Sequence, residues 1–230
     1  MTGYSRVSNF LVAITVALLA NACAAGAPPT AAPAATPHAM GSQNLKAGTY
    51  AFDHQPFAAA SGKPFPNILI TVPDGWNSFE GFAVQSHLGT VRQMAVSVWK
   101  VADVYANGCH WLGPKIHPGP TVDELATVLS TRPLRNATAP AAVSLAGYQG
   151  KYLQWSVPVD ADFSACDQGT FMSWSADGDR YQQGPGQVDQ LWILDVQGHR
   201  LVIDATYMPG ATEQDRTELA KVLNSIAFKP

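Results

Sequence analysis

The chain has 230 residues, of which 47% are hydrophobic and 13% are charged, and its formal net charge at pH 7 is −3. The charged fraction is about half of that in an average globular protein, and the sequence contains no run of Lys or Arg. Nucleic-acid binding needs clustered cations that displace phosphate counterions, so this composition argues against a nucleic-acid partner.

The N-terminal region has the order of an export signal. Arg6 precedes the uncharged apolar run FLVAITVALLA, which is too short to span a bilayer as a helix. Small residues then stand directly before Cys23 in the stretch ANAC. This order predicts a signal peptide over residues 1–22. Its removal takes away Arg6, the only Lys, Arg, Asp or Glu in that region, and changes the net charge from −3 to −4.

Cys23 resembles the cysteine of a bacterial lipobox, which is lipidated and becomes the new N-terminus. Lipidation predicts a location on the outer face of the cell membrane, with the membrane as a partner through the N-terminal anchor. The alternative is cleavage at the same small residues and free secretion. The next residues are almost all Ala, Pro, Gly and Thr, and such a segment cannot bury enough surface to offset its ordering entropy. We therefore predict a tether over residues 23–45 and a single globular domain over residues 46–230.

The cysteine count predicts a disulfide in this domain. The chain has three cysteines, and only Cys109 and Cys166 remain once Cys23 is lipidated or removed. In an oxidising compartment such a pair most simply forms one bridge. A closed loop of this length stabilises the fold by about 4 kcal/mol in the chain-entropy description.

The first half of the domain predicts successive antiparallel strands, each with one face toward the core. In the stretch NILITVPDGW, Ile68, Ile70 and Val72 alternate with less apolar neighbours before a Pro-Asp-Gly turn. Strands over residues 81–87 and 93–105 follow. In the second of these, Met94, Val96 and Val98 alternate with Ala95, Ser97 and Trp99.

A change of period predicts a helix near residue 121. Thr121 and Glu124 have the spacing of a capping box, and Pro133 marks the end of the helix. The apolar residues at helical spacing are Val122, Leu125, Ala126 and Leu129. A second capping signature at Thr212 and Asp215 predicts a C-terminal helix. Its apolar face consists of Leu219, Val222, Leu223 and Ile226.

Strands are predicted between the two helices. Residues 141–158 favour strands around a Gly147–Gly150 bend, residues 170–175 a short strand, and residues 189–209 a hairpin that turns at Gln197–Gly198. Strands and helices are segregated along the chain rather than alternating. The predicted class is therefore α+β, with an antiparallel sheet and two helices packed on it.

Several stretches of the chain resemble the PsbP-like fold. They are ILITVPDGW, VSLAGYQGKYL and the terminal ELAKVLNSIAF. NGCHW, CDQGTF and RYQQGPGQVDQLWILDVQG are similar to motifs of exported lipoproteins of actinobacteria, among them Lpq-type lipoproteins of mycobacteria. The resemblance covers residues 48–228. It implies a PsbP-like sandwich with a binding or scaffolding role, and it transfers no catalytic residue.

Aromatic and amide side chains around a Gly-Pro-Gly loop form the predicted ligand-binding face. Flat rings and planar amides suit a neutral polar ligand such as a sugar, and an envelope protein is the other expected partner. The candidates are His110 and Trp111 beside the disulfide, together with Trp174, Tyr181, Gln182, Gln183 and Gln187. The alternative is that the aromatic residues are half-buried sheet residues with polar tips outward.

Other chemistry has weaker support. His110, His117 and Asp167 lack the ligand spacing of a zinc site, so no metal or cofactor is predicted. A hydrolase using Asp167 and His110, with Ser164 nearby, is the alternative function, although no G-x-S-x-G motif supports it. The leading prediction is a non-catalytic exported domain of the cell envelope that binds a ligand or a protein through a loop face.

Overall fold

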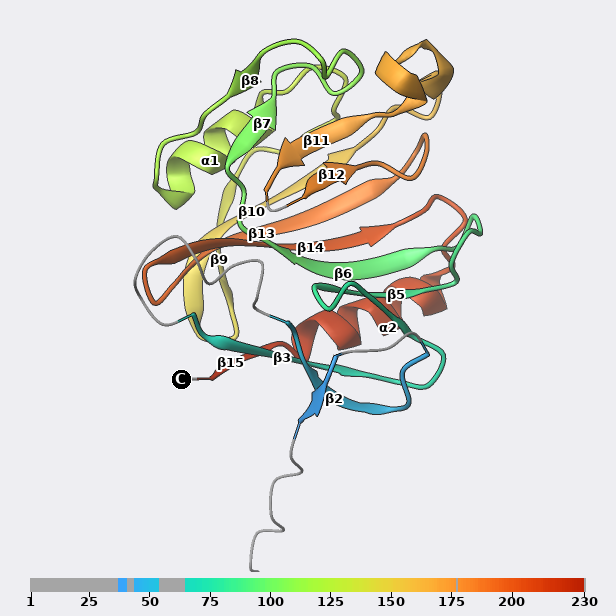
Figure 1. Cartoon of the computed structure of the whole chain (residues 1–230), viewed down its shortest axis with the longest axis vertical. Helices are drawn as coiled ribbons and strands as arrows, with labels where there is room; N and C mark the ends of the chain where they lie inside the picture. Colours follow the sequence, from blue (N-terminus) through green and yellow to red (C-terminus); the bar gives the residue numbers. More distant parts are fainter. Residues whose placement is uncertain (1–36, 41–43, 54–64, 177, 230) are drawn as a thin grey trace, which may run out of the picture. The chain divides into compact units, whose positions relative to one another are not determined.

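The computed structural model describes residues 37–40, 44–53, 65–176 and 178–229 (Figure 1). The predicted signal peptide, the lipidation site Cys23 and most of the predicted tether lie outside these residues.

A seven-stranded antiparallel sheet lies at the centre of the described residues (Figure 1). In spatial order its strands are β4 (Asn77–Phe79), β5 (Ala83–Ser86), β6 (Met94–Trp99), β14 (His199–Tyr207), β13 (Val188–Val196), β10 (Tyr148–Ser156) and β9 (Ala141–Leu145). β13 and β14 form the predicted hairpin. Its turn residues Gln197 and Gly198 have φ values of 55° and 82°, the left-handed backbone that a two-residue hairpin turn requires.

A four-stranded sheet and the C-terminal helix cover one face of the seven-stranded sheet. The strands are β1 (His38–Ala39), β2 (Gly48–Ala51), β3 (Asn67–Val72) and β15 (Ala227–Lys229), and β1 pairs with β2 in parallel. The helix α2 (Glu213–Asn224) contacts β3, β6 and β14. Ile68, Ile70 and Val72 of β3 are buried as predicted, and they belong to this first core with Leu219 and Val222 of α2.

A second four-stranded sheet and α1 lie on the other face (Figure 1). Its strands, in spatial order, are β12 (Asp179–Tyr181), β11 (Met172–Ser175), β7 (Asp103–Tyr105) and β8 (Lys115–Ile116). The helix α1 (Val122–Ser130) contacts β10 and β13. Two 3-10 turns, η1 (Phe163–Ala165) and η2 (Asp167–Gly169), precede β11. Leu125 and Leu129 of α1 pack with Trp155 and Trp174 in the second core.

The predicted starts of both helices are confirmed, whereas α2 ends at Asn224 and leaves Ile226, expected on its apolar face, outside the helix. Thr121 caps α1 in a capping box with Glu124, and Thr212 caps α2 in the same way with Asp215. Each box satisfies two backbone N–H groups that have no partner within the helix. α1 ends at Ser130, before the predicted stop at a proline.

Three strand predictions need correction. Residues 93–105 form two strands in different sheets, β6 in the seven-stranded sheet and β7 in the second four-stranded sheet, instead of one strand. Val96 and Val98 of β6 face the first core, and on the opposite face Ser97 and Trp99 are also buried while Ala95 is partly exposed. The turn between β9 and β10 lies at Ala146–Gly147, where both residues have positive φ, and not across Gly147–Gly150. Gly150 is inside β10, where a Cβ would come within 2.0 Å of the Ile193 carbonyl oxygen. This glycine permits close pairing of strands rather than a bend.

Residues assigned to the tether take part in packing. His38 and Ala39 pair with β2, and the side chains of Met40 and Leu45 are each 4% exposed within the first core. These two apolar side chains are the reason that packing begins before residue 46.

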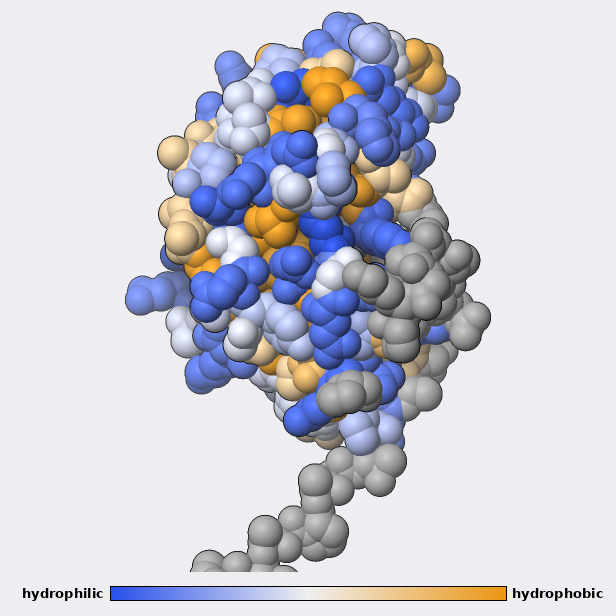
Figure 2. Space-filling model, turned by 90° about the vertical axis from the view of Figure 1, so that its left-hand side faces the viewer, coloured by the Kyte–Doolittle hydropathy of each residue, from blue (hydrophilic) through white to orange (hydrophobic). Residues whose placement is uncertain are grey.

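In the part of the chain that the structure describes, the α+β class, antiparallel pairing and two helices are confirmed, although three sheets replace the one that was predicted. On the face in Figure 2, hydrophobic residues lie in separate patches between hydrophilic ones. Among the described residues, no helix has the length and apolar character needed to cross a membrane.

Candidate functional site

An open groove with a volume of about 750 Å³ lies over β5, β6 and β14, on the second-core side of the seven-stranded sheet. Its floor consists of small or polar side chains. They are Ala83, Gln85, Ala95, Ser97 and Thr206. The strand register places Ala83 opposite Ser97, and Ala95 between Gln85 and Thr206. Because all of these neighbouring side chains except Gln85 are short, the floor lies below the larger side chains of the walls.

Apolar side chains form much of the walls. Phe79, Leu88 and Tyr181 line the groove and are 41%, 47% and 45% exposed. Phe82 lies edge-on to Phe79 and to Trp99, with ring centroids 5.6 Å and 4.9 Å apart. Exposed apolar surface gathered around a concave site is typical of a binding site.

A buried ionic cluster joins the β12 wall to the central sheet. Nε of Arg180 donates to Oδ2 of Asp204 at 2.9 Å, and Nη2 donates to Oδ1 of Asp189 at 2.9 Å. Both carboxylates are fully buried, whereas Arg180 also lines the groove. Gln187 donates to Asp189 at 2.7 Å. Paired charges of this kind avoid the large cost of burying a single ion.

The contacts of Thr206 indicate a proton within this cluster. Its hydroxyl oxygen lies 2.8 Å from Oδ1 of Asp189 and 2.8 Å from Oδ1 of Asp204, while Arg180 donates to it at 3.0 Å. A hydroxyl has one hydrogen, so it can donate to only one of the two carboxyl groups. A proton on Asp204 satisfies both contacts, because Asp204 then donates to Thr206 and Thr206 donates to Asp189. Burial raises the pKa of Asp204 to about 6, so the group holds this proton below about pH 6 and has mostly lost it at pH 7.

Tyr181 and Gln183 are the predicted ligand residues that line the groove. The burial of Trp174, Gln182 and Gln187 does not fit the predicted ligand-contact role, because their side chains are at most 3% exposed. Trp174 packs between two other tryptophans of the second core. The two glutamines form internal hydrogen bonds, Gln182 to Ser173 at 2.7 Å and Gln187 to Asp189.

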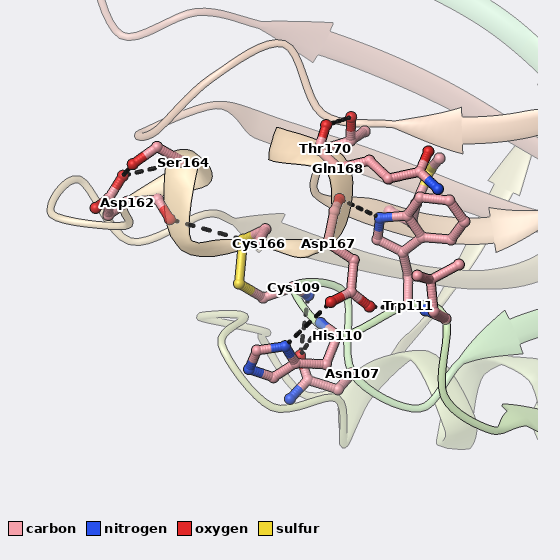
Figure 3. Close-up of a disulfide and its surroundings, with 12 residues drawn as sticks. Asn107, Cys109, His110, Trp111, Asp162, Ser164, Cys166, Asp167, Gln168 and Thr170 are labelled. Atoms are coloured by element: carbon pink, nitrogen blue, oxygen red, sulfur yellow. Dashed lines mark hydrogen bonds and ion pairs between the residues drawn. A yellow bond between two sulfur atoms is a disulfide. The ribbon is translucent and has the colours of Figure 1, made fainter.

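His110 and Trp111 lie beside the disulfide and do not line the groove (Figure 3). Cys109 and Cys166 are joined in the predicted bridge. Nε1 of Trp111 donates to the backbone carbonyl of Asp167 at 2.8 Å, so its polar tip is used within the protein. The face expected from sequence therefore divides into two places, the disulfide region and the groove.

The pair expected for a hydrolase is formed, but its surroundings are not those of a triad. Nδ1 of His110 lies 3.5 Å from Oδ1 of Asp167. Ser164 donates to Asp162 at 2.6 Å and turns toward it instead of toward His110 (Figure 3). A cavity of about 290 Å³ beside the disulfide is lined by Asp162 but by neither member of the pair.

Residues considered for a metal site are dispersed. His117 contacts Asp103, with Nδ1 and Oδ1 2.9 Å apart, whereas His110 contacts Asp167. Within the described ranges, no three His, Cys, Asp or Glu side chains are grouped as a metal ion would require.

Sequence reasoning missed most of the groove. Phe79, Trp99 and Arg180 line it without any local motif. Two signals were present in the sequence. Small residues alternate with valines in β6, and the charged residues Asp189 and Asp204 stand within largely apolar strands. Charges at such places mark a buried polar cluster.

Comparisons with known proteins assign no family to this chain. No family model matches it, and no curated protein matches it. Among solved structures, it is similar to the crystal structure of LpqN involved in cell envelope biogenesis of Mycobacterium tuberculosis. The similarity covers 80% of this chain and 91% of that chain, at 12% sequence identity and a TM-score of 0.38. A similarity of this strength carries no argument about function.

Proposed function

We propose that the chain is an exported domain of the cell envelope, anchored by a lipid on Cys23, that binds a ligand in the groove over β5, β6 and β14. The groove itself carries the proposal. Its volume of about 750 Å³ lies within the range of small-molecule sites, which is roughly 300–1,000 Å³. A bound ligand would cover the apolar surface that Phe79, Leu88 and Tyr181 expose at the rim.

The proposed compartment rests on the N-terminal sequence and the disulfide. A signal-peptide pattern, a lipobox-like Cys23 and a bridged cysteine pair all fit the outside of a cell. The resemblance to PsbP-like domains of exported lipoproteins, and a protein partner in the envelope, stay predictions.

Groove binding can be tested with Nile red, a neutral dye whose emission rises in an apolar site. Ala95→Phe fills the floor of the groove, because Ala95 is a partly exposed residue at its centre. Ala142→Phe adds the same ring to the exposed edge strand β9, away from the groove. We expect Ala95→Phe to abolish the dye signal and Ala142→Phe to preserve it. Equal signals from all three proteins would contradict the proposal.

The second candidate is a hydrolase, favoured by the 3.5 Å contact between His110 and Asp167. It predicts ester or glycoside turnover that is lost in both His110→Ala and Asp167→Asn. No turnover by the wild type across an esterase and glycosidase panel would remove this candidate.

A further inference from the structure

We propose that the groove binds a small organic cation with an apolar body. This inference rests on the proposed function, because it assigns a ligand class to the same groove. It replaces the neutral polar ligand expected from sequence, since three of the side chains behind that expectation are buried.

The groove offers no cation to an anionic ligand. Among the described residues that line it, Arg180 is the only Lys or Arg. Its Nε donates to Asp204, and its Nη2 donates to Asp189 and Thr206. Nη1 donates to the backbone carbonyl of Tyr181. The guanidinium is thus committed to partners within the protein, and a phosphate or carboxylate would meet no free charged donor.

The fixed charges around the groove are mainly negative. Glu80 and Asp179 line it, and Asp189 and Asp204 lie behind Arg180. The buried Arg135 also interacts with Asp189 and Asp204, so two cations stand against these four carboxyl groups. Tyr105 donates to Oδ1 of Asp179 at 2.8 Å, which holds this carboxylate in place at the wall. A low-dielectric wall strengthens the attraction of such charges for a cation.

Aromatic rings supply the second feature that a cation recognises. Phe79, Phe82, Trp99 and Tyr181 all line the groove. The face of an aromatic ring carries partial negative charge, and organic cations bind over such faces. The same rings, with Leu88 and Met208, suit the apolar body of the ligand. The volume of the groove is typical of a site for a small molecule, so a small-molecule ligand fits it better than a protein partner does.

Three probes with the same decyl chain can test the charge preference. They are decyltrimethylammonium, decyl maltoside and decyl sulfate, each titrated into the full chain by calorimetry below its micelle concentration. We expect the cation to bind about tenfold or more tightly than either of the others, because it alone gains both carboxylate and ring contacts. Ala95→Phe should abolish its binding.

Charge-removing variants test the physical cause. The double variant Glu80→Gln/Asp179→Asn should reduce the preference for the cation to within about threefold. A matched control, Asp123→Asn/Glu213→Gln, removes two carboxylates from the exposed surfaces of α1 and α2 and should leave the preference unchanged.

The possible failures are distinguishable. Equal or tighter binding of the sulfate or the maltoside, lost in Ala95→Phe, would overturn the cation proposal and leave the groove as a binding site. A preference that persists in Glu80→Gln/Asp179→Asn would also overturn it. No binding of any probe would overturn both this inference and the proposed function.

Discussion

Nε of Arg180 donates to Oδ2 of Asp204 at 2.9 Å, and both side chains are buried. Arg180 belongs to β12, at the edge of a four-stranded sheet, whereas Asp204 lies within β14 at the middle of the seven-stranded sheet. The contact therefore joins one wall of the groove to the sheet that forms its floor. The shape of the groove depends on this pair, because the β12 wall carries few apolar residues of its own.

Arg180→Met should destabilise the protein by about 3–5 kcal/mol, because it leaves two buried carboxyl groups without their counter-charge. Urea unfolding followed by far-UV circular dichroism measures this change. Lys151→Met is a suitable control, since Lys151 pairs with the exposed Asp123 at 3.1 Å and its removal should cost less than about 1 kcal/mol. Equal losses of stability in Arg180→Met and Lys151→Met would show that the buried ion pair stabilises the fold no more than the exposed one does.

The stability should depend on pH through Asp204. Burial raises its pKa from 3.8 to about 6, so the native state holds this proton more tightly than the unfolded chain does. The resulting stabilisation is fully present below pH 3.8 and is lost as the pH rises through 6. Its size is on the order of 3 kcal/mol.

Asp204→Asn isolates this effect, because the amide cannot titrate. The free energy of unfolding of the wild type minus that of Asp204→Asn should fall between the two pKa values and level off above pH 6. The low pKa of Asp215, caused mainly by its hydrogen bond from Arg92, acts in both proteins and cancels in the difference. A difference that stays constant with pH would contradict a raised pKa at Asp204.

Cys109→Ser/Cys166→Ser should lower the stability by about 4 kcal/mol, because the bridge no longer restricts the unfolded chain. The folded loops should stay together. The amide of Asp167 donates to the carbonyl of Cys109 at 2.8 Å, and Trp111 also donates to Asp167. Thermal unfolding measures the loss, and dye binding in the groove should be unchanged. Intact mass of the wild type under non-reducing conditions should be two hydrogens below that of the reduced chain; two free thiols would refute the bridge.

Metabolic labelling with a fatty acid tests the anchor at Cys23, which lies outside the described residues. The wild type should carry the label and partition with membranes, whereas Cys23→Ser should be unlabelled. An unlabelled wild type recovered from the medium would favour ordinary cleavage and free secretion.

Local features were predictable from sequence because neighbouring residues determine them. The capping boxes at Thr121 and Thr212 each need residues only three positions apart. The Gln197–Gly198 turn and the alternation in β3 are equally local. The disulfide followed from counting, because only two cysteines remained to pair.

The ligand face was not predictable in the same way. Trp174, Gln182 and Gln187 look like surface residues because they flank a Gly-Pro-Gly loop, yet β11 and the cluster around Asp189 bury them. A polar side chain can end in solvent or in an internal hydrogen bond, and local sequence does not distinguish the two. Burial of Ser97 and Trp99 on the second face of β6 was hidden for a similar reason, since Ala95, Ser97 and Trp99 alternate as a half-exposed strand would.

The sequence by itself predicted an export signal, and it determined the α+β class, the helix starts, the hairpin and the cysteine pair, because each depends on short spacing, composition or count. Only the tertiary structure decided where the groove of the proposed binding site lies. The groove combines Phe79 and Trp99 with Tyr181 and Thr206, which lie about a hundred residues further along the chain. Those segments meet only because β14 pairs with β6 and because Arg180 is held by carboxylates of the central sheet. Long-range strand pairing and a buried ionic cluster thus placed the site.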